Sequence, residues 1–184
     1  MSAPFPIATP SQTVGPFFSF GLTTDHRLGI VATADAPGEH IRLTIRVWDG
    51  DAVPVSDAMI ELSQADHAGL FATTPNFRGF GRLGTSADGA VTFDTVRPAA
   101  QSDSSAPREA AHVNLCVFMR GLLRQLYTRA YFPGDPALAE DPVLALVPPD
   151  RRQTLMAKPM AHDESAWAFD IHLQGEHETV FFDV

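Results

Sequence analysis

Hydrophobic and polar residues alternate along much of the chain after residue 40. In residues 40–48, apolar side chains occupy every second position, at Ile41, Leu43, Ile45 and Val47. This period of two is typical of a strand with one buried face. The same pattern between turn residues predicts strands over residues 53–65, 89–96, 112–119, 125–132, 167–173 and 179–182. Such a set of short strands predicts an all-β fold, an antiparallel β-sandwich.

Helical signals are few and short. One short helix is predicted over residues 151–158, and a turn or so of helix within residues 137–147. Residues 1–40 form a long extended arm, because prolines and glycines recur there and block regular structure. The arm also carries several phenylalanines, so we expect it to lie against a surface of this chain or of a partner. We predict a single domain over residues 1–184, with a loop at residues 99–106.

Composition excludes several classes of protein. The 184 residues carry 13 basic and 22 acidic side chains, a net charge of −9, which argues against a nucleic-acid partner. The single cysteine, Cys116, rules out an internal disulfide framework. No apolar run approaches the roughly 18 residues of a membrane helix, and the first residues lack the pattern of a secretory signal. The expectation is a cytoplasmic protein without a membrane partner.

The candidate metal chemistry centres on His112. Asn114 lies two residues further and shares its strand face, as the second imidazole of a His-x-His pair would. An amide is a poor ligand for a trivalent cation, so half of such a site is missing. No nucleophile elbow and no phosphate-binding glycine loop is present. We therefore assign no catalytic residue and no metal ligand to this chain.

The strand at residues 125–132 carries a second candidate feature. Tyr127, Arg129 and Tyr131 share one face of it, with the guanidinium between the two phenol rings. An arginine in this setting can bind a carboxylate with two parallel hydrogen bonds. The alternative is that the face is a stripe within an interface.

Five segments of the chain resemble the intradiol ring-cleavage dioxygenase family. Together they span almost the whole sequence, at residues 9–17, 75–82, 95–98, 131–136 and 175–182. The first of them reads Thr-Pro-Ser-Gln-Thr-Val-Gly-Pro-Phe, and the last reads Gly-Glu-His-Glu-Thr-Val-Phe-Phe. The resemblance implies a β-sandwich and non-haem ferric iron, held in catalytic chains by two tyrosines and two histidines.

The ligand pattern of the family is mostly lost here. The family's histidines lie in an Arg-Pro-Ala-His-Ile-His stretch, which corresponds to Glu-Ala-Ala-His-Val-Asn in this chain. His112 keeps the first histidine, Asn114 replaces the second, and Glu109 stands at the arginine position. The two tyrosine positions fall in segments without tyrosine, at residues 69–71 and 99–101. This departure is the pattern of the family's chain that carries no iron.

The resemblance therefore implies one subunit of a hetero-oligomeric enzyme. Fe(III) would be bound by an iron-bearing beta subunit, and the complex would cleave a small catechol, 3,4-dihydroxybenzoate, with O₂ to 3-carboxy-cis,cis-muconate. The family pattern places Thr13, Gly15 and Pro16 in the partner's substrate pocket, and Arg129 on the substrate side. A hydroxyl, a glycine that permits close backbone approach and a stiffening proline suit that task. The alternatives are a homomeric intradiol dioxygenase with unusual ligands and a non-catalytic β-sandwich assembly module.

Overall fold

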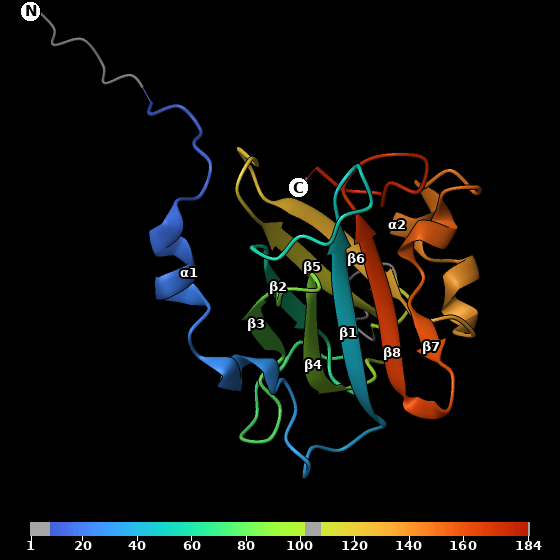
Figure 1. Cartoon of the computed structure of the whole chain (residues 1–184). Helices are drawn as coiled ribbons and strands as arrows, with labels where there is room; N and C mark the ends of the chain where they lie inside the picture. The colour runs from blue at the N-terminus through green and yellow to red at the C-terminus, as the bar shows by residue number, and fades with distance from the viewer. Residues whose placement is uncertain (1–7, 102–107, 184) are drawn as a thin grey trace, which may run out of the picture.

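Two four-stranded sheets form the body of the molecule (Figure 1). The computed structural model describes residues 8–101 and 108–183. One sheet has the order β4 (Ala90–Val96), β1 (His40–Trp48), β8 (Asp163–His172) and β7 (Lys158–Met160). The other has the order β3 (Phe80–Gly84), β2 (Met59–Gln64), β5 (His112–Phe118) and β6 (Leu126–Tyr131). Every pairing within the sheets is antiparallel except that of β1 with β8, so the predicted sandwich is confirmed.

The core lies between the two sheets and follows the alternation of the sequence. Leu43 and Ile45 of β1 face Leu115 and Val117 of β5 across a core in which all four side chains are fully buried. Burial of each such side chain contributes about 1.5–3 kcal/mol. Most outward positions of the same strands are partly exposed, with His112 of β5 buried, and these outer faces carry the features described below.

Several predicted elements differ from the observed ones. The strand predicted from residue 53 begins only at Met59, because Pro54 lacks an N–H for the ladder and makes an isolated bridge with Trp48. The segment 179–182 contributes a single bridge to Tyr127 through Phe182 rather than a strand. The helix predicted over residues 151–158 is a 3₁₀ turn, η3 (Arg152–Leu155), followed by β7.

The arm is not irregular throughout. It contains α1 (Pro16–Leu22) and the 3₁₀ turn η1 (His26–Gly29), a difference from the prediction for residues 1–40. Pro16 begins the helix, at the position where a missing N–H costs nothing. None of the residues of α1 is buried, and the helix stands beside the sandwich in Figure 1. Residues 1–7 of the arm and 102–106 of the predicted loop lie outside the described residues.

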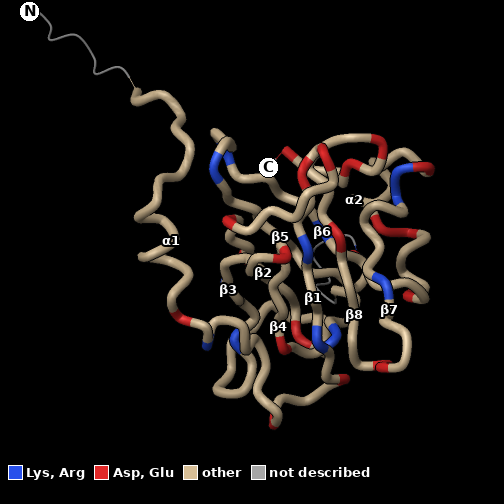
Figure 2. Tube along the Cα trace, in the orientation of Figure 1, with Lys and Arg blue, Asp and Glu red and all other residues tan. Residues whose placement is uncertain are grey.

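The remaining helical turns lie between β6 and β7. They are η2 (Pro136–Ala139), α2 (Pro142–Ala145) and η3. In the described part of the chain, every helix is too short or too polar to cross a bilayer. Acidic and basic positions are interspersed over the body, whereas residues 8–24 of the arm carry no charged side chain (Figure 2).

Candidate functional site

A polar cluster occupies the outer face of β5 and β6. The antiparallel register pairs His112 with Tyr131 and Asn114 with Arg129, while Tyr127 lies one pair further along. Because residues two apart point to the same face of a strand, all five side chains lie on one surface of the sheet. The sequence predicted that His112 and Asn114 share one face of their strand, and that Tyr127, Arg129 and Tyr131 share one face of theirs. The structure brings the two faces together.

Arg129 is held by an internal ion pair. Its Nη1 donates to Oε2 of Glu109 at 2.7 Å and lies 3.5 Å from the hydroxyl of Tyr131. Gln101 Nε2 donates to the same carboxylate oxygen at 3.4 Å. The side chains of Arg129 and Glu109 are only 13% and 21% exposed, so solvent screens this pair poorly. Removal of either partner would leave a poorly solvated charge.

His112 is buried and fixed in one tautomer. Its Nδ1 lies 2.7 Å from the carbonyl oxygen of Ala110, and a carbonyl only accepts, so Nδ1 carries the proton. The lone pair of Nε2 therefore faces Oε2 of Glu109 at 3.6 Å, without a hydrogen-bond partner among the described residues. Burial, and then the charge of Arg129, lowers the pKa of His112 below its ordinary value. The imidazole is neutral at neutral pH.

Two aspartates fix the chain just before β5. Asp135 caps η2 by accepting from one backbone N–H of its first turn, and Asp141 caps α2 by accepting from two. The second oxygen of Asp135 accepts from the N–H of Ala111 at 2.7 Å. The second oxygen of Asp141 accepts from the N–H of Ala110 at 2.8 Å. The helical turns therefore set the position of the first residue of β5.

Both phenols of the cluster are protonated and engaged. The hydroxyl of Tyr131 donates to Asp141 at 3.2 Å, and that of Tyr127 donates to Oδ1 of Asn114 at 2.5 Å. Burial raises the pKa of Tyr127. Burial also raises the pKa of Tyr131 well above its ordinary value, and the nearby carboxylate of Asp141 acts in the same direction. Neither side chain is poised to become a phenolate ligand.

The predicted arm residues lie at a different place. Thr13 is exposed, and its hydroxyl oxygen accepts from the backbone N–H of Gly121 at 2.8 Å. Gly15 is the N-cap of α1, and a Cβ added to it would meet nothing within 4 Å. Pro16 follows as the first residue of the helix. Thr13 thus ties the arm to the loop between β5 and β6.

The structure does not bring the arm and Arg129 together within one chain. Gly121 lies beyond the end of β5, whereas Asn114, the partner of Arg129, lies near its start. Asn114 lies four strand residues before Phe118, the last residue of β5, a span of roughly 13 Å, and Gly121 lies in the turn that follows. Arg129 and Thr13 of the same chain therefore lie near opposite ends of β5.

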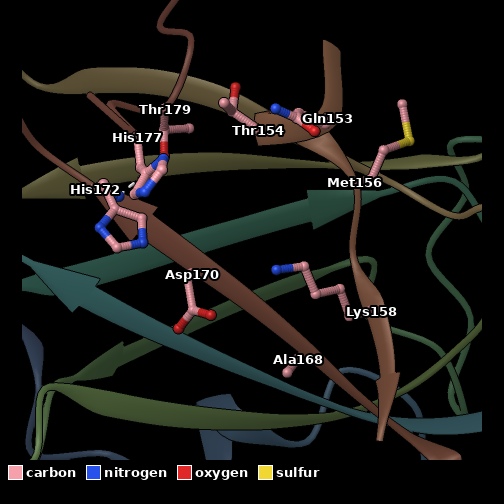
Figure 3. Close-up of a pocket in the computed structure, with 9 residues that line it drawn as sticks. All are labelled: Gln153, Thr154, Met156, Lys158, Ala168, Asp170, His172, His177 and Thr179. Carbon is pink, nitrogen blue, oxygen red and sulfur yellow. Dashed lines mark hydrogen bonds between the residues drawn. The ribbon is translucent and has the colours of Figure 1, made fainter. Parts of the chain in front are cut away.

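A hollow of about 350 Å³ lies on the outer face of the other sheet (Figure 3). Acidic and basic groups line it together, and the ring centroids of His172 and His177 are 6.2 Å apart. None of the predicted site residues lines it. Its lining consists of Gln153, Thr154, Met156, Lys158, Ala168, Asp170, His172, His177 and Thr179.

Sequence reasoning missed the structural role of three acidic residues in the cluster. Asp135 and Asp141 are each followed by a proline, and Asp-Pro is a recognisable start of a helix. That signal could have located both caps, though not the hydrogen bonds that their second oxygens accept from Ala110 and Ala111. Glu109 precedes the strand and lies outside its period of two, so its pairing with Arg129 has no local signature.

Comparison with known proteins places the chain in a family. Residues 13–175 match the family described as dioxygenase. The alpha chain of protocatechuate 3,4-dioxygenase from Burkholderia cepacia is 43% identical over 195 residues, which cover 96% of this chain and 97% of the relative. The beta chain of protocatechuate 3,4-dioxygenase from Burkholderia cepacia is 33% identical over 174 residues, covering 84% of this chain and 74% of the relative.

The fold agrees with this placement. The solved structure of 3-chlorocatechol 1,2-dioxygenase from Rhodococcus opacus 1CP superposes with a TM-score of 0.64 at 20% identity, covering 90% of this chain and 71% of the other. That likeness concerns the sandwich alone. The sandwich and the sequence matches define a dioxygenase of the ring-cleaving class. The chain belongs to the intradiol ring-cleavage dioxygenase family, as its motifs indicated.

Members of this family depend on non-haem Fe(III), and the cluster around His112 does not fit that ion. Only one imidazole nitrogen is free, the amide of Asn114 is engaged by a phenol, and both phenols are protonated. The guanidinium of Arg129 adds a positive charge beside the single imidazole. Within residues 8–101 and 108–183, no group of three His, Cys, Asp or Glu side chains could hold a metal ion.

Proposed function

We propose that the chain is the non-iron-binding alpha subunit of a protocatechuate 3,4-dioxygenase. In this proposal an iron-bearing beta subunit holds the Fe(III), and the complex cleaves 3,4-dihydroxybenzoate with O₂ to 3-carboxy-cis,cis-muconate. The alpha subunit contributes part of the wall of the partner's substrate pocket and excludes water there.

The donor set around His112 carries the proposal. A ferric ion prefers several anionic ligands, whereas this cluster offers one neutral imidazole and one carboxylate, that of Glu109, which is already paired with a guanidinium. The same donors disfavour a homomeric dioxygenase with unusual ligands. The similarity to alpha chains over nearly the full length disfavours an assembly module without a catalytic association.

The arm supports the need for a partner. Phe17 and Phe20 on α1 are 86% and 71% exposed, and no charged residue occurs in residues 8–24. Large exposed rings without charges between them are typical of a surface that another chain covers. We propose that the iron-bearing subunit covers this face of α1.

Thr13, Gly15 and Pro16 are the proposed contribution to the partner's pocket. All three are exposed in this chain, and the open space around Gly15 lets another backbone or a substrate approach closely. The hydroxyl of Thr13 accepts one hydrogen bond from Gly121 and can still donate its own hydrogen. These are the properties that a loop in a shared pocket requires.

A substrate-binding role for Arg129 stays a prediction. Its guanidinium is paired with Glu109, so it could bind a substrate carboxylate only through its remaining N–H groups or after exchange of that partner.

Co-expression with an iron-bearing beta chain tests the assembly. The proposal expects a stable complex with equal numbers of both chains, iron in the complex, and turnover of 3,4-dihydroxybenzoate that neither chain shows by itself. Iron bound stoichiometrically by the isolated alpha chain, or failure of the two chains to associate, would overturn it.

Gly15→Phe tests the shared pocket. Because an added side chain meets nothing within this chain, its effect in the complex reports on the neighbour. We expect at least a tenfold higher KM for 3,4-dihydroxybenzoate, with the iron content unchanged. Leu146→Phe, at an exposed position next to α2, is the control and should leave KM within twofold. An unchanged KM in Gly15→Phe would remove the arm from the pocket.

A further inference from the structure

His112 and Glu109 have the spacing of two ligands of one metal ion. Nε2 of the imidazole and Oε2 of the carboxylate are 3.6 Å apart. Two donor atoms that each lie about 2.1 Å from a tetrahedral ion are separated by about 3.4 Å. The proton on Nδ1, donated to the carbonyl of Ala110, leaves the lone pair on the nitrogen that points toward the carboxylate.

A guanidinium uses the oxygen that such an ion would need. Nη1 of Arg129 donates to the same Oε2 of Glu109 at 2.7 Å, and the ion pair is only slightly exposed. A metal ion at Oε2 would have to displace this N–H and then lie next to an unpaired positive charge. In a partly buried setting, repulsion between two cations is only weakly screened.

We propose that Arg129 is the resident cation of this cluster and that its guanidinium excludes divalent metal ions from Glu109 and His112. The loss of the family's ligands does not by itself exclude a metal ion, because Nε2 of His112 and Oε2 of Glu109 remain as two usable donors. The proposal concerns this chain by itself, so it holds or fails independently of the shared pocket with a partner.

A substitution at Asn114 separates two explanations for the exclusion of a metal ion, which are the loss of the family's ligands and the positive charge of Arg129. Asn114 shares the strand face of His112 and pairs directly with Arg129. The substitution Asn114→His would give two imidazoles and one carboxylate, the set typical of non-haem Fe(II) and related divalent sites. If ligand loss alone bars the metal, this change is sufficient. If Arg129 bars it, the arginine must be removed as well.

The experiment is a Co²⁺ titration of the full chain, followed by visible absorbance and isothermal calorimetry. Three variants are compared: Asn114→His, the double variant Asn114→His/Arg129→Met, and the control Asn114→His/Arg82→Met. Arg82 is matched to Arg129, because it forms a 2.6 Å ion pair with Glu61 on the same sheet and is about one quarter exposed. We expect the double variant to bind Co²⁺ at least tenfold more tightly than Asn114→His, and the control to stay within twofold.

Two results would overturn the proposal. The first is tight Co²⁺ binding by Asn114→His with Arg129 in place, and this variant decides the matter even if the double variant does not fold. The second is a folded double variant that binds no more tightly than Asn114→His. Circular dichroism verifies the fold, and Asn114→His/Arg129→Gln replaces the methionine variant if that one unfolds.

Discussion

The carboxylate of Asp141 joins three parts of the chain. It is 1% exposed, and it accepts from the N–H of Leu144 at 2.7 Å, from the N–H of Ala110 at 2.8 Å and from the hydroxyl of Tyr131 at 3.2 Å. One residue therefore begins α2, fixes the entry to β5 and satisfies a buried phenol. Its effect on stability should exceed that of an ordinary helix cap.

We expect Asp141→Ala to lower the free energy of unfolding by about 3 kcal/mol, because a cap is lost and buried N–H and O–H donors remain unpaired. Asp141→Asn keeps one acceptor oxygen and should lose less. Urea denaturation measures both. The control is Asp163→Ala at the partly exposed start of β8, where a loss under about 1 kcal/mol is expected. Equal losses at the two sites would contradict this account.

His112 makes stability depend on pH. Its pKa is lowered, chiefly by burial, so between that pKa and about 6.5 the unfolded chain binds a proton that the folded chain does not. The contribution of His112 to the free energy of unfolding is therefore constant above about pH 6.5. Below about pH 6.5, the free energy of unfolding falls as the pH decreases. The slope from one group is at most about 1.4 kcal/mol per pH unit.

The variant His112→Gln isolates this term. We expect the loss of unfolding free energy between about pH 7.5 and pH 5.5 to be smaller in His112→Gln than in the unchanged chain by roughly 1 kcal/mol. Equilibrium urea curves at the two pH values provide the measurement. His26→Gln, at an exposed histidine, is the control for removal of one imidazole. An identical pH dependence in His112→Gln and the unchanged chain would show that His112 does not cause it.

At the scale of elements, α1 depends on very little of its own chain. It spans seven residues, has no side-chain cap and buries none of its residues. Its contacts with the body include the Phe18–Phe118 ring pair, with centroids 6.1 Å apart, and the nearby link from Thr13 to Gly121. A helix of this length is marginal in water without tertiary packing.

Hydrogen exchange should therefore distinguish α1 from the sandwich. We expect amides of residues 18–22 to exchange within seconds in the isolated chain, while those of β1 and β5 are protected by the core. In a complex with an iron-bearing subunit, the α1 amides should become protected at least tenfold. Thr13→Val tests the anchor, since it removes the acceptor for Gly121 and should accelerate proteolysis of the arm. Strong protection of α1 in the isolated chain would contradict the expectation.

The predictability of each element follows from how its residues are buried. β1 was predicted with its observed bounds because one face is core and the other is not. The sequence pattern predicts no strand over β3, because its glycines resemble loop residues. Gly81 is a strand residue where a Cβ would lie 2.8 Å from the carbonyl of Leu28 and from the ring of Phe93. This close approach is a tertiary contact between distant segments, and no local sequence pattern predicts it.

The same distinction applies to the site. The faces of β5 and β6 follow from a period of two, so the meeting of His112 and Arg129 needed only the pairing of the strands. The ion pair of Arg129 with Glu109 depends on the position of the segment just before β5, which lies outside both strands. The two aspartate caps fix that position through their hydrogen bonds to Ala110 and Ala111. Sequence reasoning therefore predicted the surface of the site but not its internal charge balance.

At the scale of the whole molecule, the sandwich is held by pairings between distant segments. The parallel pair of β1 with β8 joins residues 42–48 to residues 166–172, and β2 with β5 joins residues 59–64 to residues 113–118. Such pairings form together or not at all, so we expect the body to unfold in one transition. This would also support the single domain predicted for residues 1–184, with the arm as an appendage.

Deletion of residues 1–22 tests this division of the molecule. Because α1 buries no residue, the deletion should shift the Tm of the isolated chain by less than about 2 °C. Phe169→Ala, which empties a side-chain position in the core, should instead cost about 3–5 kcal/mol. The same deletion should abolish association with an iron-bearing subunit, because it removes Phe17 and Phe20. Calorimetry of the isolated chain and gel filtration of the mixture separate the two effects, and a large loss of Tm on deletion would show that the arm belongs to the folded body.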